Sequence, residues 1–286
     1  MSATTASLMP PTRTRPTRQR LGSLARGVAI AVVTLIFVIP LIWMLTASFK
    51  TSLQIIDSQY LINFTPTLSN YATVFDGHDF GQYIVNSFLV GVGSTVIALL
   101  LGVPAAYGIA RYKIRQATTF VLLARVIPGV SLLVPWYFLF SQIRMVGTYG
   151  VLILTHIFVT MPLVIAIMSG FFEGLPEELE ESGLIDGCSR FTAFLRITLP
   201  LSVPGIATST ILAFIFSWNN FLFALVLSNR DTRTLPVAIA NFTSYASVDW
   251  GGLMAAAVAV TVPVMIIALF AQRYVVSGLT AGATKG

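Results

Sequence analysis

One polar stretch, residues 173–200, gathers most of the side chains that could do chemistry in this chain. It holds six of the eleven acidic residues, namely Glu173, Glu177, Glu178, Glu180, Glu181 and Asp186. The chain as a whole is only 10% charged and 56% hydrophobic, whereas a soluble domain carries about 25% charged residues. Acids concentrated in one short internal segment of such an apolar chain are presented to a partner.

The order of residues in 173–200 predicts two short helices joined by a tight bend. Pro176 suits the first turn of a helix, and the glutamates after it favour that end through the helix dipole. Asp186 and Gly187 supply a turn, and Ser189 can cap a second helix. The pair Leu199–Pro200 ends that helix. The sequence therefore predicts a compact knob whose apolar residues need a partner surface.

The chain lacks the motif that would let it hydrolyse ATP. A phosphate-binding loop needs a Gly–Lys pair followed by Ser or Thr, and none of Lys50, Lys113 and Lys285 follows a glycine. We therefore expect no enzymatic activity and no cofactor bound by this chain.

No metal or redox site is expected either. The two histidines, His78 and His156, have no cluster of acids or cysteines near them in the sequence. A single cysteine, Cys188, excludes an intrachain disulfide, and we interpret it as a small residue filling a helix turn.

Polar residues within the apolar runs are the candidates for a substrate path, because such residues are costly in a membrane and usually face a cavity or a partner helix. They are Asn86, Arg125, His156, Asn219 and Asn220, with Trp136 and Trp218 as aromatic neighbours. Amides and Arg suit sugar hydroxyls, and an aromatic face suits a sugar ring.

Each candidate has a plainer explanation. Interhelical hydrogen bonding is the usual role of membrane Asn, and it weighs equally with substrate contact for Trp218 and Asn220. Packing is favoured for Asn86 and His156. Arg125 could line an aqueous path or pair with a carboxylate of another subunit, but extension of its side chain to a near interface ranks first.

The elements that must position these residues are membrane helices. Runs of about 20 apolar residues are long enough to span a bilayer, and continuous apolar runs favour helices, which satisfy their own backbone hydrogen bonds. Six spans are predicted, at 27–48, 82–110, 118–140, 150–172, 203–228 and 251–272. They contain no Asp or Glu, which argues against a proton-coupled carrier.

The distribution of Lys and Arg predicts the orientation, because these residues favour cytoplasmic connections. They concentrate in residues 1–26, in 111–115, in 173–200 and in the tail 273–286, so both termini and the polar stretch are expected in the cytoplasm. Residues 1–26 are predicted to be a disordered basic segment. We expect the first span to be retained rather than cleaved, because its apolar run is longer than that of a typical signal peptide.

Two separated stretches resemble one protein family. The segment 181–200 resembles the "EAA" loop of permease subunits of bacterial ABC importers. The resemblance lies in Glu181-Ser182-Gly183, in Asp186-Gly187 and in Ile197-Thr198-Leu199-Pro200. Residues 272–286 and 216–225 look like the carbohydrate branch of that family, of the maltose and trehalose type. Ser182, Gly183 and Cys188 depart from the usual loop, and Gly183 would weaken a helix by up to about 1 kcal/mol relative to Ala.

The resemblance implies an all-α membrane protein with the type I importer permease fold, in a bacterial inner membrane. It implies a second homologous permease subunit, two ATP-binding subunits that hold ATP and Mg, and an extracytoplasmic solute-binding protein. The binding protein is needed because the outer loops 49–81 and 229–250 are too small to capture a substrate. The residues carried over for contact with the ATPases are Glu181, Asp186, Gly187, Leu199 and Pro200 in the loop, and Gln272, Gly278, Leu279 and Thr280 in the tail. An ion-coupled carrier and a non-transport membrane scaffold remain the alternatives.

Overall fold

The computed structural model describes residues 17–77, 79–243 and 248–281, and these residues divide into two units. The first unit ends at Thr46 and contains helix α1 (Thr17–Ala47) except for its last residue. The second unit starts at that last residue, Ala47. Most of its apolar side chains are exposed, as expected of a helix that contacts lipid or another chain. The helix begins at Thr17, so the prediction of disorder through residue 26 is wrong for residues 17–26, while residues 1–16 lie outside the described part.

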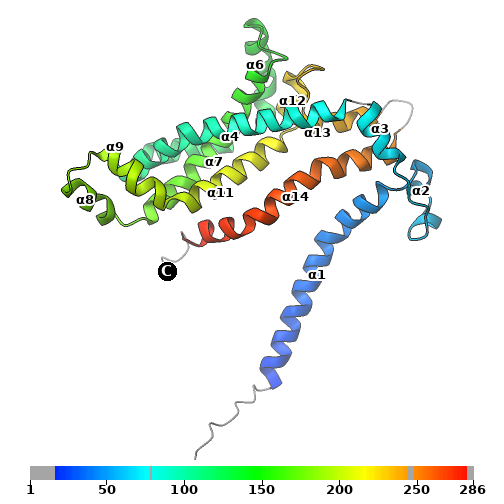
Figure 1. The fold of residues 1–286 in the computed structure, drawn as a ribbon, viewed down its shortest axis with the longest axis horizontal. Helices are drawn as coiled ribbons and strands as arrows, with labels where there is room; N and C mark the ends of the chain where they lie inside the picture. Colours follow the sequence, from blue (N-terminus) through cyan, green and yellow to red (C-terminus); the bar gives the residue numbers. More distant parts are fainter. Residues whose placement is uncertain (1–16, 78, 244–247, 282–286) are drawn as a thin grey trace, which may run out of the picture. The chain divides into compact units, whose positions relative to one another are not determined.

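Four long helices build the second unit: α4 (Phe80–Arg111), α7 (Tyr149–Gly174), α11 (Val203–Trp218) and α14 (Trp250–Ala281). Helix α4 packs along α7, and α11 packs against α4, α7 and α14 (Figure 1). Small residues allow the helices to approach closely, as is common in membrane bundles. A Cβ atom on Gly91 would lie 2.9 Å from the ring of Phe214, and one on Gly102 would lie 3.0 Å from Val164.

The expected span 118–140 is bent rather than continuous, and the expected span 203–228 is preceded by a helical segment that meets it at an angle. Helices α5 (Arg115–Val126) and α6 (Gly129–Gln142) meet at 89°, and the segment Arg190–Leu201 meets α11 at 74°. In the described residues, four helices are long and apolar enough to cross a membrane, namely α1, α4, α7 and α14. The number is up to six if each bent pair counts as one span. The first bend falls at Ile127–Pro128, where proline disfavours helical geometry in the preceding residue.

The fifth span also ends earlier than predicted. Helix α11 stops at Trp218, and after a break at Asn219–Phe221 the short helix α12, Leu222–Leu227, follows. A continuous helix over 203–228 is therefore wrong. Asn219 and Asn220 lie in this break, which forms one wall of the pocket described below.

Short helices join the long ones at both ends of the bundle. At one end lie α8 (Glu178–Ile185), α9 (Arg190–Ala193), the π-helical turn η2 (Phe194–Thr198) and α10 (Leu199–Leu201). At the other end lie α2 (Ser52–Ile56), η1 (Ser58–Tyr60), α3 (Ser69–Gly77), α13 (Leu235–Ala238) and η3 (Ile239–Phe242). The fold described here contains no strand beyond an isolated bridge between Thr243 and Val248.

Candidate functional site

The polar stretch 173–200 folds as a helical hairpin at the end of α4. Helix α8 is followed by a turn at Gly187, and Ser189 begins α9 by accepting a hydrogen bond from the backbone amide of Thr192 at 3.2 Å. The predicted two short helices are present. The second continues through η2 into α10 (Leu199–Leu201), so the prediction that Leu199–Pro200 ends it is wrong, because Pro200 lies in a first helical turn, where proline is tolerated.

Gly187 ends α8 in a conformation that favours glycine, with φ +87°. The amide of Gly187 donates to the carbonyl of Leu184 at 3.1 Å, and the amide of Cys188 donates to the carbonyl of Gly183 at 3.0 Å. These two bonds together form a Schellman motif, which satisfies the last carbonyls of a helix. The turn between the two helices is thus fixed by backbone geometry.

Gly183 is buried and allows α8 to approach η2. A Cβ atom placed on it would lie 2.5 Å from Cδ1 of Ile197 and 4.0 Å from Cβ of Ala193. The lower helix propensity of glycine is therefore accompanied by closer packing between the two helices of the hairpin. The sequence indicated only the loss of propensity.

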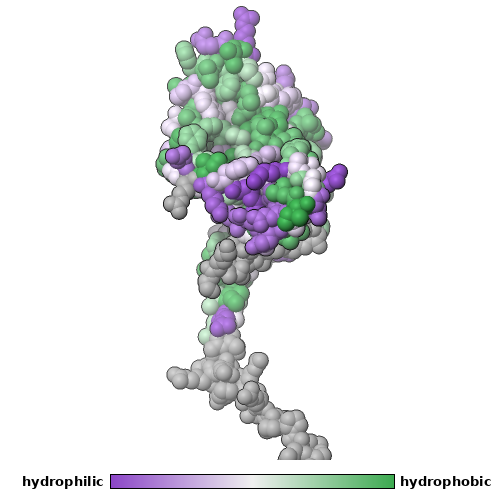
Figure 2. Space-filling view, turned by 90° about the vertical axis from the view of Figure 1, so that its left-hand side faces the viewer, coloured by the Kyte–Doolittle hydropathy of each residue, from purple (hydrophilic) through white to green (hydrophobic). Residues whose placement is uncertain are grey.

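The outer surface of the hairpin presents acids beside apolar side chains. Glu181 and Asp186 are exposed, as is Gly187. Ile185 is 86% exposed and Phe191 is 69% exposed, although both are large and apolar. Figure 2 faces this end of the second unit and shows hydrophilic residues gathered next to hydrophobic ones. Such a mixed surface is typical of a contact with another protein.

Glu180, which the resemblance did not single out, is the buried acid of the hairpin, with 5% of its surface exposed. Its carboxylate accepts hydrogen bonds from the Nε of Arg111 at 2.8 Å, from the hydroxyl of Tyr107 and from the hydroxyl of Thr198 at 3.4 Å. A signal for this residue existed in the sequence, because Arg111 and Glu180 lie in two connections that are predicted on the same side of the membrane. Their pairing depends on the packing of α4 against the hairpin.

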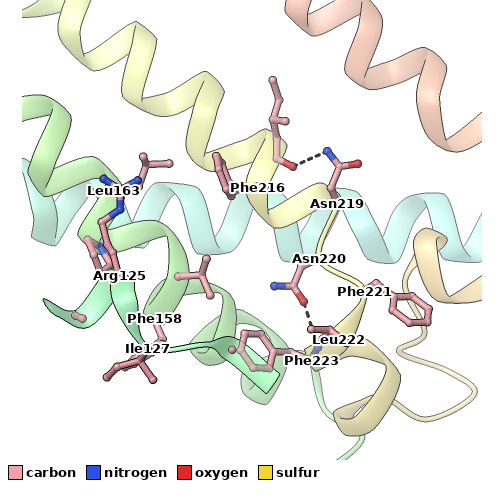
Figure 3. Close-up of a pocket in the computed structure, with 15 residues that line it drawn as sticks. Arg125, Ile127, Phe158, Leu163, Phe216, Asn219, Asn220, Phe221, Leu222 and Phe223 are labelled. Atoms are coloured by element: carbon pink, nitrogen blue, oxygen red, sulfur yellow. Dashed lines mark hydrogen bonds between the residues drawn. The ribbon is translucent and has the colours of Figure 1, made fainter. Parts of the chain in front are cut away.

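A second candidate site is a pocket of about 600 Å³ between α5, α7, α11 and the break after Trp218. This volume falls within the roughly 300–1,000 Å³ of small-molecule sites. Its lining is mostly apolar and aromatic, with three polar side chains, those of Arg125, Asn219 and Asn220 (Figure 3).

The three polar residues keep hydrogen-bonding capacity free. Asn219 donates to the carbonyl of Ile215 at 3.0 Å, and Asn220 accepts from the backbone amide of Phe223 at 3.2 Å. Figure 3 shows Arg125 and Asn220 extending from different walls of the pocket. Within the described chain, Arg125 makes no hydrogen bond or ion pair and the amide nitrogen of Asn220 has no partner, so both can bind a polar ligand.

The other candidates of the substrate path do not line this pocket. Trp218 is 3% exposed, and its indole nitrogen donates to the carbonyl of Val260 at 3.1 Å, which ties α11 to α14. The ring of Trp136 stacks among Phe140, Phe158 and Phe223. These contacts favour the packing interpretation of both tryptophans, because their rings fill contacts between helices.

Asn86 and His156 are buried in hydrogen-bonded contacts. The amide of Asn86 donates to the carbonyls of Asp231 and Arg233, both at 2.8 Å, so it fixes a loop to α4. Nδ1 of His156 lies 2.7 Å from the hydroxyl of Ser217, which lies 2.8 Å from that of Ser94. These bonds join α4, α7 and α11, and they favour the packing interpretation of both residues.

The tail residues expected to contact the ATPases lie on α14. Gln272 is exposed, and Gly278, Leu279 and Thr280 continue α14 as helix, although nothing is described of the side chains of these three. Residues 282–286 lie outside the described part. Over the described ranges, no three His, Cys, Asp or Glu side chains gather as metal ligands would.

Residues 94–281 match a protein family described as the inner membrane component of binding-protein-dependent transport systems. The chain is 37% identical over 254 residues to the trehalose transport system permease protein SugB of Mycobacterium tuberculosis, covering 87% of this chain and 92% of that protein. It is 35% identical over 259 residues to the trehalose/maltose transport system permease protein MalG of Thermococcus litoralis, covering 88% and 93%.

A solved structure with the same fold comes from a bacterial ABC transporter involved in the import of the acidic polysaccharide alginate. The TM-score is 0.73 at 19% sequence identity, and the match covers 93% of this chain and 99% of that chain. At this identity the likeness concerns the fold alone, and it agrees with the predicted importer permease architecture.

Proposed function

Since the chain belongs to the family of inner membrane components of binding-protein-dependent transport systems, as a membrane-spanning permease of the sugar ABC importer type, we propose that it imports a disaccharide such as trehalose or maltose, driven by ATP. In this proposal two ATP-binding subunits, a second homologous permease subunit and an extracytoplasmic binding protein complete the transporter. Both termini and the hairpin 173–200 face the cytoplasm.

The observation that carries the ATP-driven mechanism is the exposed surface of the hairpin. Ile185 and Phe191 would lose most of their exposed apolar surface against a partner, and burial of such a side chain contributes on the order of 1.5–3 kcal/mol. Glu181 and Asp186 beside them would fix the register of the contact. We assign this surface to an ATP-binding subunit.

The hairpin would then transmit the ATP cycle to the helices. Nucleotide binding brings the two ATP-binding subunits together. It favours one conformation of the permease, because the ATP-binding subunits bind nucleotide more tightly when the permease has that conformation. The hairpin follows the subunit to which it is docked, and the helices after it change their arrangement. ATP and Mg remain on the partner subunits.

The pocket beside the α11 break is the proposed place of sugar contact. Arg125 and Asn220 offer free hydrogen-bond donors for hydroxyl groups, and Phe158, Phe216 and Phe221 offer apolar surface for sugar rings. The names of the relatives support a disaccharide, and the free donors support a ligand with several hydroxyls.

Uptake by proteoliposomes tests the proposal. We expect vesicles that contain both permeases, the ATP-binding subunits and the binding protein to accumulate labelled trehalose or maltose only when ATP is supplied. Uptake that persists without the ATP-binding subunits would show an ion-coupled carrier and overturn the proposal.

Two variants test the pocket with a matched control. Arg125→Gln and Asn220→Ala are expected to raise the sugar concentration needed for half-maximal uptake, while the ATP-binding subunits still co-purify. Arg144→Gln, the same charge removal outside the pocket, should leave uptake unchanged. Identical uptake by Arg125→Gln, Asn220→Ala and the control would remove the pocket from the substrate path.

A further inference from the structure

Glu180 differs from the other acids of the hairpin in being buried and fully engaged. Glu177, Glu178, Glu181 and Asp186 are exposed, whereas the carboxylate of Glu180 meets three donors from outside its own helix. An acid that is turned inward cannot contribute to the docking surface. Its function must lie within the chain.

The three donors come from two different elements. Tyr107 and Arg111 occupy the last turns of α4, and Thr198 ends η2, immediately before α10 and α11. The carboxylate thus connects α8 to the end of α4 and to η2, which continues through α10 into α11. Side chains of Arg111 and Glu180 are 11% and 7% exposed, so water competes little for the pair.

Aromatic packing extends this junction to α7. The ring of Tyr107 lies 4.5 Å from that of Phe194 and 5.7 Å from that of Phe172, between ring centroids. Phe172 lies near the end of α7, and Phe194 begins η2. Tyr107 therefore holds its hydroxyl toward Glu180 from a ring that is packed against both elements.

A neighbouring ion pair shows the contrast. Lys113 and Glu177 connect the same region of α4 to the start of α8, at 3.4 Å, but their side chains are 77% and 54% exposed. An exposed pair contributes little, because water and salt screen it. A buried charge that loses its partner is strongly destabilised, because it keeps its desolvation cost. The pair Arg111–Glu180 should therefore resist separation of α4 and α8 more strongly than the pair Lys113–Glu177.

We propose that Glu180 is a positioning residue that locks α8 to the end of α4 and to η2, the turn that leads through α10 into α11, so that these elements move as one body when the hairpin is displaced. The proposal rests on the hairpin being the contact with the ATP-binding subunit. Without the lock, α8 could follow its partner while α4 and α11 stayed in place, and ATP hydrolysis would no longer be coupled to transport.

The first experiment uses the whole transporter and separates docking from coupling. We expect Glu180→Gln to retain the ATP-binding subunits but to lower the ratio of sugar-stimulated to basal ATP hydrolysis roughly tenfold, as loss of about 1.4 kcal/mol would. Lys113→Gln, which breaks the exposed pair between the same elements, should leave the ratio unchanged. Tyr107→Phe removes only one hydroxyl and should also lower the ratio. This variant still tests the proposal if the Glu180→Gln protein does not fold.

The second experiment uses the full-length chain in nanodiscs without partners. Cys188 is replaced by serine, and spin labels are placed at the exposed positions Tyr112 and Ile185, at the end of α4 and on α8. We expect a narrow distance distribution in the otherwise unchanged chain and in Lys113→Gln, and a broad one in Glu180→Gln and Tyr107→Phe.

The outcomes separate this proposal from the proposed function. Failure of the unmodified chain to retain ATP-binding subunits would overturn the docking function, while the spin-label distances would still test the lock. A second outcome would overturn the lock alone. In it, the ATP-binding subunits are retained, and Glu180→Gln and Tyr107→Phe show the same coupling ratio and the same distance distribution as Lys113→Gln.

Discussion

The turn at Gly187 offers a prediction whose magnitude follows from backbone geometry. At φ +87° any residue with a Cβ atom is strained, and a left-handed conformation costs an L-residue roughly 1–2 kcal/mol. A Cβ atom at Gly187 would meet no atom within 4 Å, so steric contact adds nothing to this cost. Gly187→Ala should therefore disfavour the native turn by about 5–30-fold.

The consequence for docking is a weaker contact with the ATP-binding subunit. If only the native turn presents Glu181 and Asp186 in register, the apparent dissociation constant should rise by up to the same 5–30-fold factor. Gly187→Asn should weaken binding less, because Asn visits left-handed conformations more readily. Gly187→Val should weaken it most, because a β-branched residue with positive φ is an outlier.

The assay is titration of the purified chain in nanodiscs with labelled ATP-binding subunits. Gly108→Ala is the control, because a Cβ there also meets no atom within 4 Å but the φ is not positive, so helix propensity can only improve. Unchanged binding by Gly187→Ala, or Asn as damaging as Val, would refute the argument from the turn.

Three further experiments test particular contacts. Asn86→Leu should lower the free energy of unfolding in detergent by about 1–3 kcal/mol, because two hydrogen bonds from the buried amide to loop carbonyls are lost; a melting temperature equal to that of the unmodified chain would contradict this. Gly183→Ala should be destabilising alone but neutral or stabilising together with Ile197→Val, which removes the Cδ1 atom 2.5 Å from the new Cβ; additive effects in a double-mutant cycle would show that the contact does not matter. Trp218→Phe should cost about 1 kcal/mol of stability through one lost hydrogen bond and leave sugar affinity in uptake assays unchanged, whereas a lower affinity would return Trp218 to the substrate path.

The amino-acid sequence by itself determined the membrane character of the chain and the outline of the hairpin. Apolar runs of about 20 residues require helices in a bilayer whatever packs around them. A turn at Asp186–Gly187 and a cap at Ser189 are likewise local, since their hydrogen bonds join residues at most five positions apart. These features need no knowledge of distant residues.

Only the tertiary structure decided which polar side chains face a pocket. Trp218, Asn219 and Asn220 are consecutive, yet the first is buried against α14 and the other two line the pocket, because α11 ends between them. The sequence predicted a continuous helix there, and a continuous helix would have distributed the three residues around its circumference.

The same reason separates Glu180 from Glu181. Adjacent residues of a helix point roughly 100° apart, so one of the two must face away from the surface that the other occupies. Which one is buried depends on where α4 places Arg111 and Tyr107, more than sixty residues earlier in the chain. A local pattern fixes the angle between neighbouring side chains, and only the packing of distant helices fixes the direction in which each one points.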